Sequence, residues 1–245
     1  MTDHREQKTY SVPAHPEPGS DHPADYFRAL FGRPDADLHG WSPRHTYPSG
    51  VQLYQQNDPV THIYFIESGI VKLSYVRPCG REMIISIRRS NWLLGVTHVC
   101  VGEDAYSATA QTLTPCSVRC IPARAFADQL TTDMALSVEL NRVLSREIRA
   151  NTSKIITLGS LPAGERLTRF LCELISEEDL DQLGKEGRLE LPLKGEDLAE
   201  IVAVTPQHLS RLLKDPAMSM YINQGKKALT IVNPLAFLRR DRPEG

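Results

Sequence analysis

The sequence lacks the segments that membrane, secreted and disulfide-linked proteins need. No apolar run among its 245 residues approaches the ~18 residues of a membrane span. Its first segment, MTDHREQKTYSVPAHPEPGS, has no apolar core of a secretory signal. The five cysteines are odd in number and form no C-x-x-C pair, which disfavours a disulfide framework and a structural zinc site. These absences predict a cytoplasmic protein with reduced thiols and no membrane partner.

Signatures of enzymes are missing as well. There is no P-loop, no G-x-S-x-G, and no H-x-H pattern of a cupin-type metal site. The expected strands carry only His62 and His98 as histidines. We therefore assign no catalytic residue and no metal ligand, and expect a protein that is not an enzyme. A metal-dependent β-barrel enzyme of the cupin type is the alternative from a different class.

An excess of positive charge is absent from the chain as a whole. Lys and Arg number 28 against 30 Asp and Glu, which gives a net charge of -2. Any nucleic-acid binding must therefore come from a local basic patch. Hydrophobic residues make up 41% and charged residues 24%, a composition that forms a folded core and is unlike that of a disordered chain.

Short runs of β-branched and aromatic residues dominate the region from 44 to 121. Turn signals rich in Gly, Pro, Asn and Asp separate these runs, which predicts a sandwich or barrel-like β domain. A polar, Pro-rich segment over 1–24 precedes it and is typical of a flexible tail. The spacing of apolar residues predicts short helices over 25–40 and 122–130.

A long helix is predicted over 132–158, and Gly159 and Pro162 are expected to end it. Two readings of its apolar seam stay open: packing on its own domain, or a two-stranded coiled coil with two Asn side chains that set the register. Because the helix lies between two predicted domains, we favour a homodimer. The seam consists of Met134, Ser137, Asn141, Leu144, Ile148, Asn151, Ile155 and Leu158.

The segment LPLKGEDLAEIVAVTPQHLSRLLKD predicts a helix-turn-helix. A helix from Gly195 to Val202 is followed by a turn, and Thr205 is placed to cap a second helix that has Pro206 at its first position. The following MSMYINQGKKALTIV predicts two strands joined by a basic turn, which is typical of a wing.

Charge on this segment favours DNA as the partner. Residues 203–240 hold six basic residues and one acid, a net charge of +5. Such a patch attracts phosphates, and the first turns of a helix in the major groove reach base edges. The expected DNA contacts are Thr205, Gln207, His208, Ser210, Arg211, Lys214, Lys226 and Lys227.

This order of parts resembles the cAMP receptor protein/FNR (CRP/FNR) family of bacterial transcription regulators, over residues 25–240. The most specific match is TPQHLSRLLK, and Gly50, Gly69, Gly80 and Gly95 fall where the family turns. The resemblance implies an α+β fold: an N-terminal β-roll (a cyclic-nucleotide-binding-like double-stranded β-helix), a long dimerisation helix and a C-terminal winged helix-turn-helix. The predicted boundaries are a tail over 1–24, a sensor domain over 25–131, a dimerisation helix over 132–160 and a DNA-binding domain over 161–245.

The resemblance also implies a homodimer on a palindromic double-stranded DNA site, with RNA polymerase as a further partner. Base-reading positions of the family hold Gln207, Ser210 and Arg211 here. Arg211 keeps the arginine that pairs with guanine, whereas Gln207 replaces the usual Glu and pairs well with adenine. We therefore expect a half-site that differs from the family's at the position next to this guanine.

In the sensor domain the resemblance implies a nucleotide pocket that this sequence has altered. Gly95 is kept, but Val96 replaces the ribose-binding Glu and Tyr106 replaces the phosphate-binding Arg. Because that charge-assisted contact is lost, we do not expect cAMP as the effector. DNA binding is then either controlled by another, unknown small molecule or constitutive. The candidate pocket residues are Gly95, Val96, Thr97, Tyr106, Ser107, Asn151 and Thr152.

The positions of cysteine and histidine bear on three other sensing chemistries of the family. No cysteine precedes Cys79, which excludes an N-terminal iron–sulfur cluster. Haem stays an alternative because His98 lies one residue past Thr97, the position of the family's haem ligand, although a one-residue slip turns a strand residue to the other face. Cys79, between Arg77 and Arg81, is the candidate for thiol redox sensing. No cofactor is required.

Three other cysteines are predicted to be structural. They are Cys116 and Cys120, which share a strand face, and Cys172 on its helix.

Overall fold

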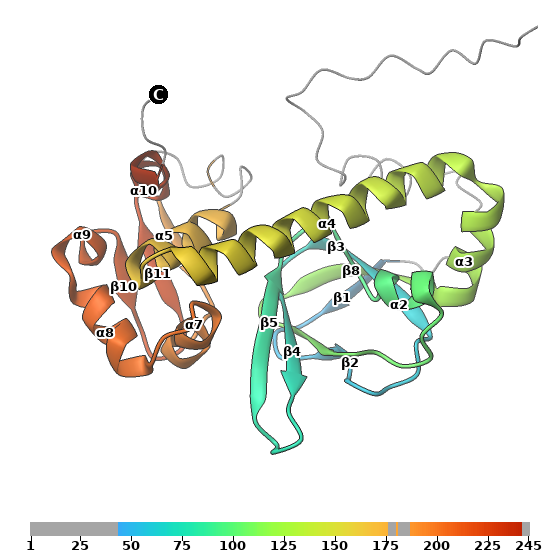
Figure 1. Cartoon of the computed structure of the whole chain (residues 1–245), viewed down its shortest axis with the longest axis horizontal. Coiled ribbons are helices and arrows are strands. Elements are labelled where there is room, and N and C mark those ends of the chain that lie inside the picture. The colour runs from blue at the N-terminus through green and yellow to red at the C-terminus, as the bar shows by residue number, and fades with distance from the viewer. Residues whose placement is uncertain (1–43, 176–179, 181–186, 242–245) are drawn as a thin grey trace, which may run out of the picture.

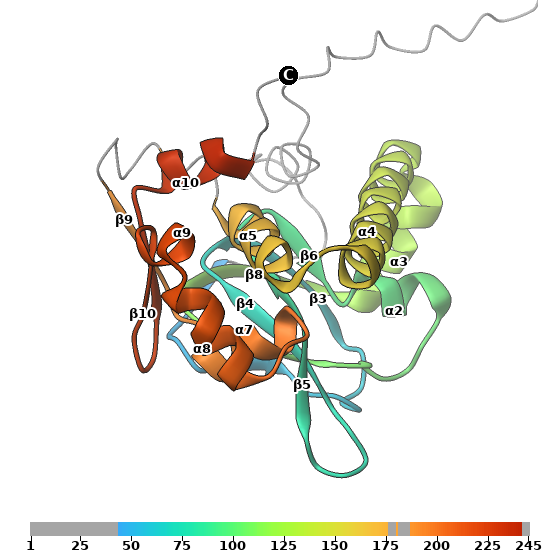
Figure 2. The ribbon, with the colours of Figure 1, turned by 60° about the vertical axis from the view of Figure 1, so that its left-hand side comes forward.

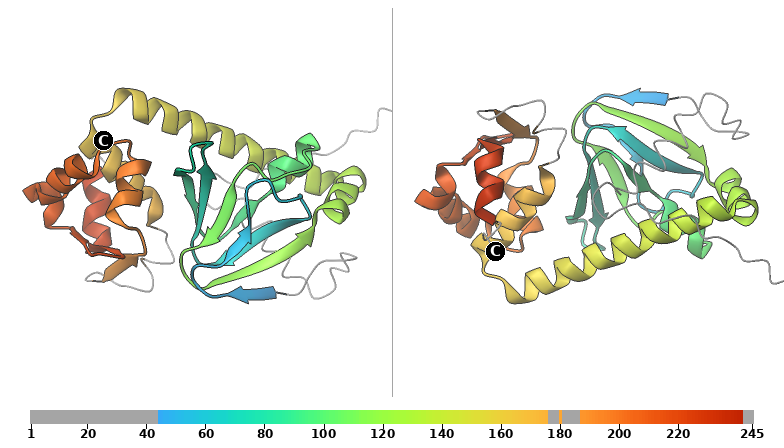
Figure 3. Two further views of the ribbon diagram at one scale, coloured as in Figure 1. Left: turned by 90° about the horizontal axis from the view of Figure 1, so that it is seen from below. Right: turned by 90° about the horizontal axis from the view of Figure 1, so that it is seen from above.

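The computed structural model describes residues 44–175, 180 and 187–241. The predicted tail over 1–24 and the predicted helix over 25–40 lie outside these residues. Figure 1 shows a β lobe and a smaller, mainly helical lobe, with one long helix, α4, running along both. The same helix is seen from above and below the molecule in Figure 3.

The β lobe consists of two four-stranded antiparallel sheets, with the orders β1-β8-β3-β6 and β2-β7-β4-β5. Its core lies between the sheets, where Ile66, Val71, Ala110 and Val118 are fully buried. The predicted β-roll is therefore confirmed. The strands are β1 Arg44–Tyr47, β2 Gln52–Tyr54, β3 His62–Ser68, β4 Val71–Val76, β5 Glu82–Arg88, β6 Trp92–Leu94, β7 Thr109–Thr112 and β8 Cys116–Pro122.

Two glycines of the roll are required by both conformation and space. Gly69 has a φ of +99°, and a Cβ there would lie 2.5 Å from the Cys116 Sγ. Gly95 has a φ of +78°, and its Cβ would lie 3.1 Å from Cε1 of Tyr106. Only glycine adopts this left-handed region without strain. The turns predicted at these two positions are thus fixed by the lack of a side chain.

The segment after Gly95 departs from the expected strand. It forms a helix, α2 Val96–Val101, because Gly95 turns the chain out of β6 and directs Val96 and Val99 into one apolar cluster. The segment from Val96 to Val101 is only six residues long, too short for its apolar spacing to distinguish a helix from a strand. His98 therefore lies on a helix, and the argument that a one-residue slip moves it across a strand was wrong.

Two helices follow the roll in the sequence and lead to the small lobe, α3 Ala123–Thr132 and α4 Met134–Ser160. Asp133 separates them and caps α4, since its side chain accepts from the Leu136 N–H at 3.0 Å. The predicted break at Gly159 was wrong, because α4 continues through it. Its end is set by Leu161, which precedes Pro162 and is extended at φ -97°, ψ 144°, as the residue before proline prefers.

Two faces of α4 differ in how far their side chains are buried. Leu136 and Leu140 are buried against the roll together with Phe126. The other side carries large apolar side chains in the open: Met134 is 77% exposed, Ile148 66% and Ile155 71%. The first part of the helix thus packs on its own lobe, while much of the predicted seam is uncovered in the single chain. No helix in the described part of the chain is long and apolar enough to cross a membrane.

The smaller lobe contains the predicted helix pair and a three-stranded sheet of order β10-β11-β9. Leu171, Leu198, Leu209 and Ile231 form its core, and Phe237 of a C-terminal helix that was not predicted closes it. The elements are α5 Ala163–Leu174, β9 Arg188–Leu191, α7 Gly195–Ile201, α8 Pro206–Lys214, α9 Pro216–Ser219, β10 Ile222–Gln224, β11 Leu229–Val232 and α10 Pro234–Asp241.

Strand β5 connects the lobes. Ile84 and Ile87 are buried in the same apolar cluster as the core of the smaller lobe. The Ile84 N–H also donates to a carboxylate oxygen of Glu200 on α7, at 3.4 Å. The β4–β5 hairpin and α7 lie beside each other in Figures 2 and 3. A change in the roll can therefore reach the helix pair directly.

Candidate nucleic-acid interface and sensor pocket

The turn between α7 and α8 is held by an arginine that sequence reasoning did not identify. Ala203 has a φ of 54°, unusual for a residue with a side chain. Arg166 on α5 donates to the carbonyls of Val202, at 3.0 Å, and Ala203, at 3.2 Å. A third bond, at 3.0 Å, joins it to the carbonyl of Leu161 after α4. One guanidinium thus ties the end of the long helix to the helix pair.

The start of α8 follows the sequence prediction. Thr205 is extended at φ -75°, ψ 153°, and its hydroxyl accepts from the His208 N–H at 3.2 Å. Pro206 occupies the first helical position, where a missing N–H leaves no bond unmade. Leu209 is buried, and Leu212 and Leu213 pack partly against the core. These contacts fix which side of α8 points outward.

The outward side of α8, called the α8 face below, is polar and unengaged. All of its side chains are exposed, and within the described residues none makes a hydrogen bond or an ion pair. Figure 2 shows α8 at the surface of the small lobe, near the hairpin formed by β10 and β11. The α8 face consists of Gln207, His208, Ser210, Arg211 and Lys214.

The predicted wing is present as the β10–β11 hairpin. The Gly225 N–H donates to the Ala228 carbonyl at 2.8 Å, which closes the turn that carries the exposed Lys226 and Lys227. A groove of about 750 Å³ runs between this turn and α8. Two of the expected DNA contacts, Lys214 and Lys226, line it, together with Lys194, which the sequence did not single out.

In the β lobe, Tyr106 fills the space beside Gly95. Its ring stacks on Tyr54 with centroids 3.9 Å apart, and it is 2% exposed. Its hydroxyl donates to the His62 carbonyl at 2.5 Å and accepts from the His62 N–H at 3.2 Å. His62 lies opposite Pro122, which has no N–H for the ladder. Tyr106 thus completes the sheet, and burial raises the pKa of its hydroxyl.

His98 is also engaged within the lobe. The Ser107 N–H donates to His98 Nε2 at 2.8 Å, so that nitrogen is an acceptor and the proton of the neutral ring lies on Nδ1. The Ser107 hydroxyl lies 3.0 Å from the same nitrogen. To bind iron through Nε2, the ring would have to release Ser107. Val96 is buried beside this site, whereas Thr97 is exposed.

The remaining candidate pocket residues lie elsewhere. Asn151 and Thr152 are exposed on α4, and the Thr152 hydroxyl donates to the Ile148 carbonyl at 2.9 Å. Asn151 lines a separate cavity that contains Arg88 and Glu147 but none of the residues around Gly95. The structure therefore divides the predicted pocket in two. The sequence did not indicate a role for Arg88, which is one charged residue at the end of the run EMIISIRR.

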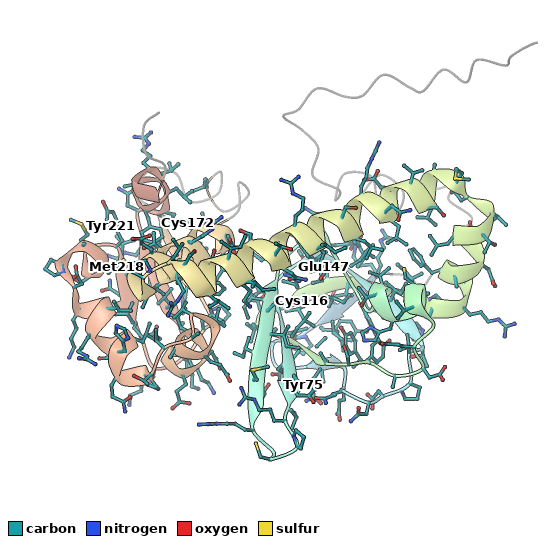
Figure 4. All side chains as sticks on the ribbon, viewed as in Figure 1. Tyr75, Cys116, Glu147, Cys172, Met218 and Tyr221 are labelled. Carbon is teal, nitrogen blue, oxygen red and sulfur yellow. The ribbon has the colours of Figure 1, made fainter. Side chains whose placement is uncertain are left out.

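The cysteines have the expected exposures. Cys79 is exposed in the β4–β5 turn, where Arg77 directs its guanidinium to the Met83 sulfur at 3.0 Å. Cys116 and Cys120 are buried in the roll, and burial raises the pKa of both thiols. Cys172, on α5, is half-buried and packs against the core of the small lobe (Figure 4). Thiol sensing at Cys79 stays a prediction.

Comparisons with known proteins agree with this architecture. Residues 44–133 match the cyclic nucleotide-binding domain family, and residues 165–240 match the Crp-like helix-turn-helix domain family. The chain is 30% identical to the global nitrogen regulator of Synechocystis over 195 residues, covering 78% of this chain and 85% of that protein.

Two further comparisons give the same picture. The chain is 27% identical to the fumarate and nitrate reduction regulatory protein of Vibrio cholerae, covering 75% of this chain and 72% of that protein. Among solved structures, FixK2 from Bradyrhizobium japonicum shares the fold with a TM-score of 0.64 at 19% identity, covering 83% of this chain and 98% of FixK2.

Proposed function

This chain belongs to the CRP/FNR family of DNA-binding transcription regulators, and from that premise we propose that it acts as a homodimer on a palindromic DNA site, without cAMP as its effector. The observation that carries DNA recognition is the α8 face. Its polar side chains are exposed and uncommitted, on a helix whose start is capped and whose turn is clamped by Arg166. A helix held in this way can place side chains against base edges.

The homodimer is supported by the uncovered side of α4. Met134, Ile148 and Ile155 are each more than half exposed and lie along one helix. Apolar side chains in such a row are typical of an interface between copies. Asn141 is exposed and donates to the Ser137 carbonyl at 2.9 Å in the single chain, so a register-setting role would require it to turn towards the partner. Pairing would place two α8 helices on one side of a duplex, about 34 Å apart.

Base preference follows from Gln207 and Arg211. The Arg211 guanidinium can donate twice to guanine, and the Gln207 amide can both donate to and accept from adenine. Ser210 lies between them on the α8 face, while Lys226 and Lys227 of the wing are placed for phosphates. We expect the half-site to contain adenine next to the guanine read by Arg211. Contact with RNA polymerase is what the family implies for the bound dimer.

An effector other than cAMP, or none, is supported by the state of the roll. The position of the family's phosphate-binding Arg holds Tyr106, whose hydroxyl is committed to the His62 backbone. Val96, at the ribose position, is buried in an apolar cluster. At these two positions a cyclic nucleotide would meet a buried tyrosine in place of a cation and a valine in place of an acceptor, and it would have to displace the stacked Tyr106 ring.

The test is a selection of random duplex DNA by the purified full-length protein, with no effector and again with cAMP. We expect an enriched palindrome whose yield cAMP does not change. The selection is repeated with Gln207→Glu, which should shift the base next to the guanine from adenine towards cytosine. Enrichment of non-palindromic sites would contradict the homodimer, and a requirement for cAMP would contradict the altered pocket.

A further inference from the structure

Arg166 lies where the end of the long helix meets the small lobe. In Figures 1 and 3 the last turns of α4 reach the small lobe beside α5, the helix that carries this arginine. All three nitrogens of its guanidinium are used. Nη1 donates to the Leu161 carbonyl at 3.0 Å, Nε to the Val202 carbonyl at 3.0 Å and Nη2 to the Ala203 carbonyl at 3.2 Å. One side chain therefore bridges α4 and the helix pair.

Two of these three carbonyls belong to helix ends. Leu161 directly follows α4, and Val202 directly follows α7. Carbonyls at the C-terminal end of a helix lack partners within that helix, and they form the negative end of its dipole. A cation that donates to both ends couples the direction of α4 to that of α7. Arginine suits this role because its donors form a rigid planar fork, whereas a lysine ammonium is a point charge on a flexible stem.

The same guanidinium fixes the turn before α8. Its bonds to the carbonyls of Val202 and Ala203 hold the two peptide groups on either side of Ala203, whose φ is 54°. A residue with a side chain adopts this left-handed region at a cost in energy, so contacts around the turn must maintain it. The direction of α8 relative to α7 thus also depends on Arg166.

Helix α5 is itself held by the roll and by α4. Arg89, which directly follows β5, donates to the Leu174 carbonyl at the end of α5. Arg169 on α5 donates to the Ser153 hydroxyl of α4 at 3.2 Å. These two bonds place α5, and Arg166 then carries that placement to the helix pair.

The remaining contacts hold the small lobe near the roll without fixing its angle. Ile84 and Ile87 of β5 are buried in the core of the small lobe, but apolar burial is non-directional. The bond from the Ile84 N–H to Glu200 is long, at 3.4 Å. A groove of about 840 Å³ is lined by Leu158 of α4, by Arg166 and by the turn over 203–205, so packing does not close this space. The directional bonds of Arg166 therefore set the angle.

We propose that Arg166 is the positioning residue that determines the spacing between the two half-sites in DNA. The inference rests on the proposed homodimer, because pairing along α4 makes the angle between α4 and α8 decide where the two α8 helices lie. One extra base pair between half-sites moves the second by about 3.4 Å and turns it by roughly 35°. A rigid dimer rejects such a site, and a loosened dimer accepts it.

The test measures binding of the full-length protein to four duplexes by fluorescence anisotropy at fixed salt. Three contain the selected half-sites at the selected spacing, at one base pair fewer and at one base pair more, and the fourth contains a single half-site. The parent should bind the selected spacing at least about tenfold more tightly than either neighbouring spacing. This ratio is the spacing preference.

Arg166→Lys is the decisive variant, because it keeps the charge and loses the fork. It should bind all three spacings within about threefold of one another, and the single half-site within about twofold of the parent, since its α8 face is unchanged. Arg166→Gln should lose the spacing preference in the same way. Arg188→Lys makes the matched change at an exposed arginine of β9 and should keep the preference of the parent.

An unchanged spacing preference in Arg166→Lys would overturn the proposal. So would an equal loss of affinity for the single half-site and for all three spacings, which is the result expected if Arg166 only stabilises the fold. Failure of the proposed function gives a different result: the parent itself would bind palindromic and single half-site DNA equally, and the inference on spacing would fall with it.

Discussion

The α8 face and the space beside Gly95 hold the two sets of residues that a family member would use for specific contacts, and they are built in opposite ways. On the α8 face, Arg211 and Gln207 are exposed and bonded to nothing in the described chain. Beside Gly95, Tyr106 and His98 are buried and bonded to backbone atoms of the roll. Uncommitted side chains can serve an outside partner, whereas committed ones maintain the fold.

This difference determines whether a substitution changes the free energy of unfolding or the free energy of DNA binding. Exposed polar groups remain hydrated, so their removal changes stability little and changes binding strongly. Buried groups carry packing and hydrogen bonds, so their removal changes stability first. Matched substitutions in the two regions should therefore separate the two effects.

The largest effect on stability should come from Tyr106→Ala. Loss of a buried, stacked aromatic ring destabilises a fold by roughly 3–5 kcal/mol. Tyr106→Phe is the matched control: it keeps the ring and removes only the hydroxyl, for about 1 kcal/mol. Urea unfolding followed by circular dichroism measures both. If Tyr106→Ala were as stable as Tyr106→Phe, the ring would not be a structural element and the pocket could be open to a ligand.

On the other side of the comparison, Arg211→Ala should weaken specific DNA binding by about 1–3 kcal/mol and relax the choice of guanine. Stability should be unchanged, because the side chain makes no contact that the fold needs. Arg188→Ala removes another exposed arginine, from β9, at the end of the sheet away from the wing turn, and serves as the control. Fluorescence anisotropy with a labelled selected site measures both variants. Equal losses for both would indicate a general effect of charge.

A residue that is exposed like the α8 face but bonded like the residues beside Gly95 should show both effects in part. Thr205 is exposed, yet its hydroxyl caps α8 through the His208 N–H. Thr205→Ala should lower stability by about 1 kcal/mol. DNA affinity should also fall, because the first turn of α8 frays. Thr205→Ser keeps the cap and should restore both properties, which unfolding and anisotropy experiments would reveal.

The same contrast explains how much could be predicted from sequence. Caps, turns and apolar spacing are local, so α8, its Thr205 cap and the wing were all placed from the residues alone. Helix α2 was missed because its six residues are too few for their apolar spacing to distinguish a helix from a strand. Arg166 and Arg88 were missed because their roles depend on carbonyls and carboxylates that lie far away in the sequence. Local sequence patterns predict individual helices and strands, whereas the contacts that join them depend on residues far apart in the sequence.

An effect of similar size should come from a partly buried carboxylate of the roll, and this effect should depend on pH. Burial alone would raise the pKa of Glu67, but hydrogen bonds from Arg119, Arg44 and Ser117 lower it below its ordinary value. A carboxylate with a lowered folded-state pKa contributes stability above its unfolded pKa of about 4.3 and loses it as pH falls through the folded value.

Glu67→Gln should therefore reduce stability at pH 7 by about 1 kcal/mol and flatten the decline of stability below pH ~4.3, because a neutral amide does not titrate. Asn223→Asp, at the exposed position of β10, adds a carboxylate outside any such network and should leave that decline as steep as in the parent. Urea unfolding across this pH range measures both. An unchanged slope for Glu67→Gln would mean that the network beside β8 is as hydrated as the α8 face, and the contrast between the two regions would then rest on Tyr106 and His98 alone.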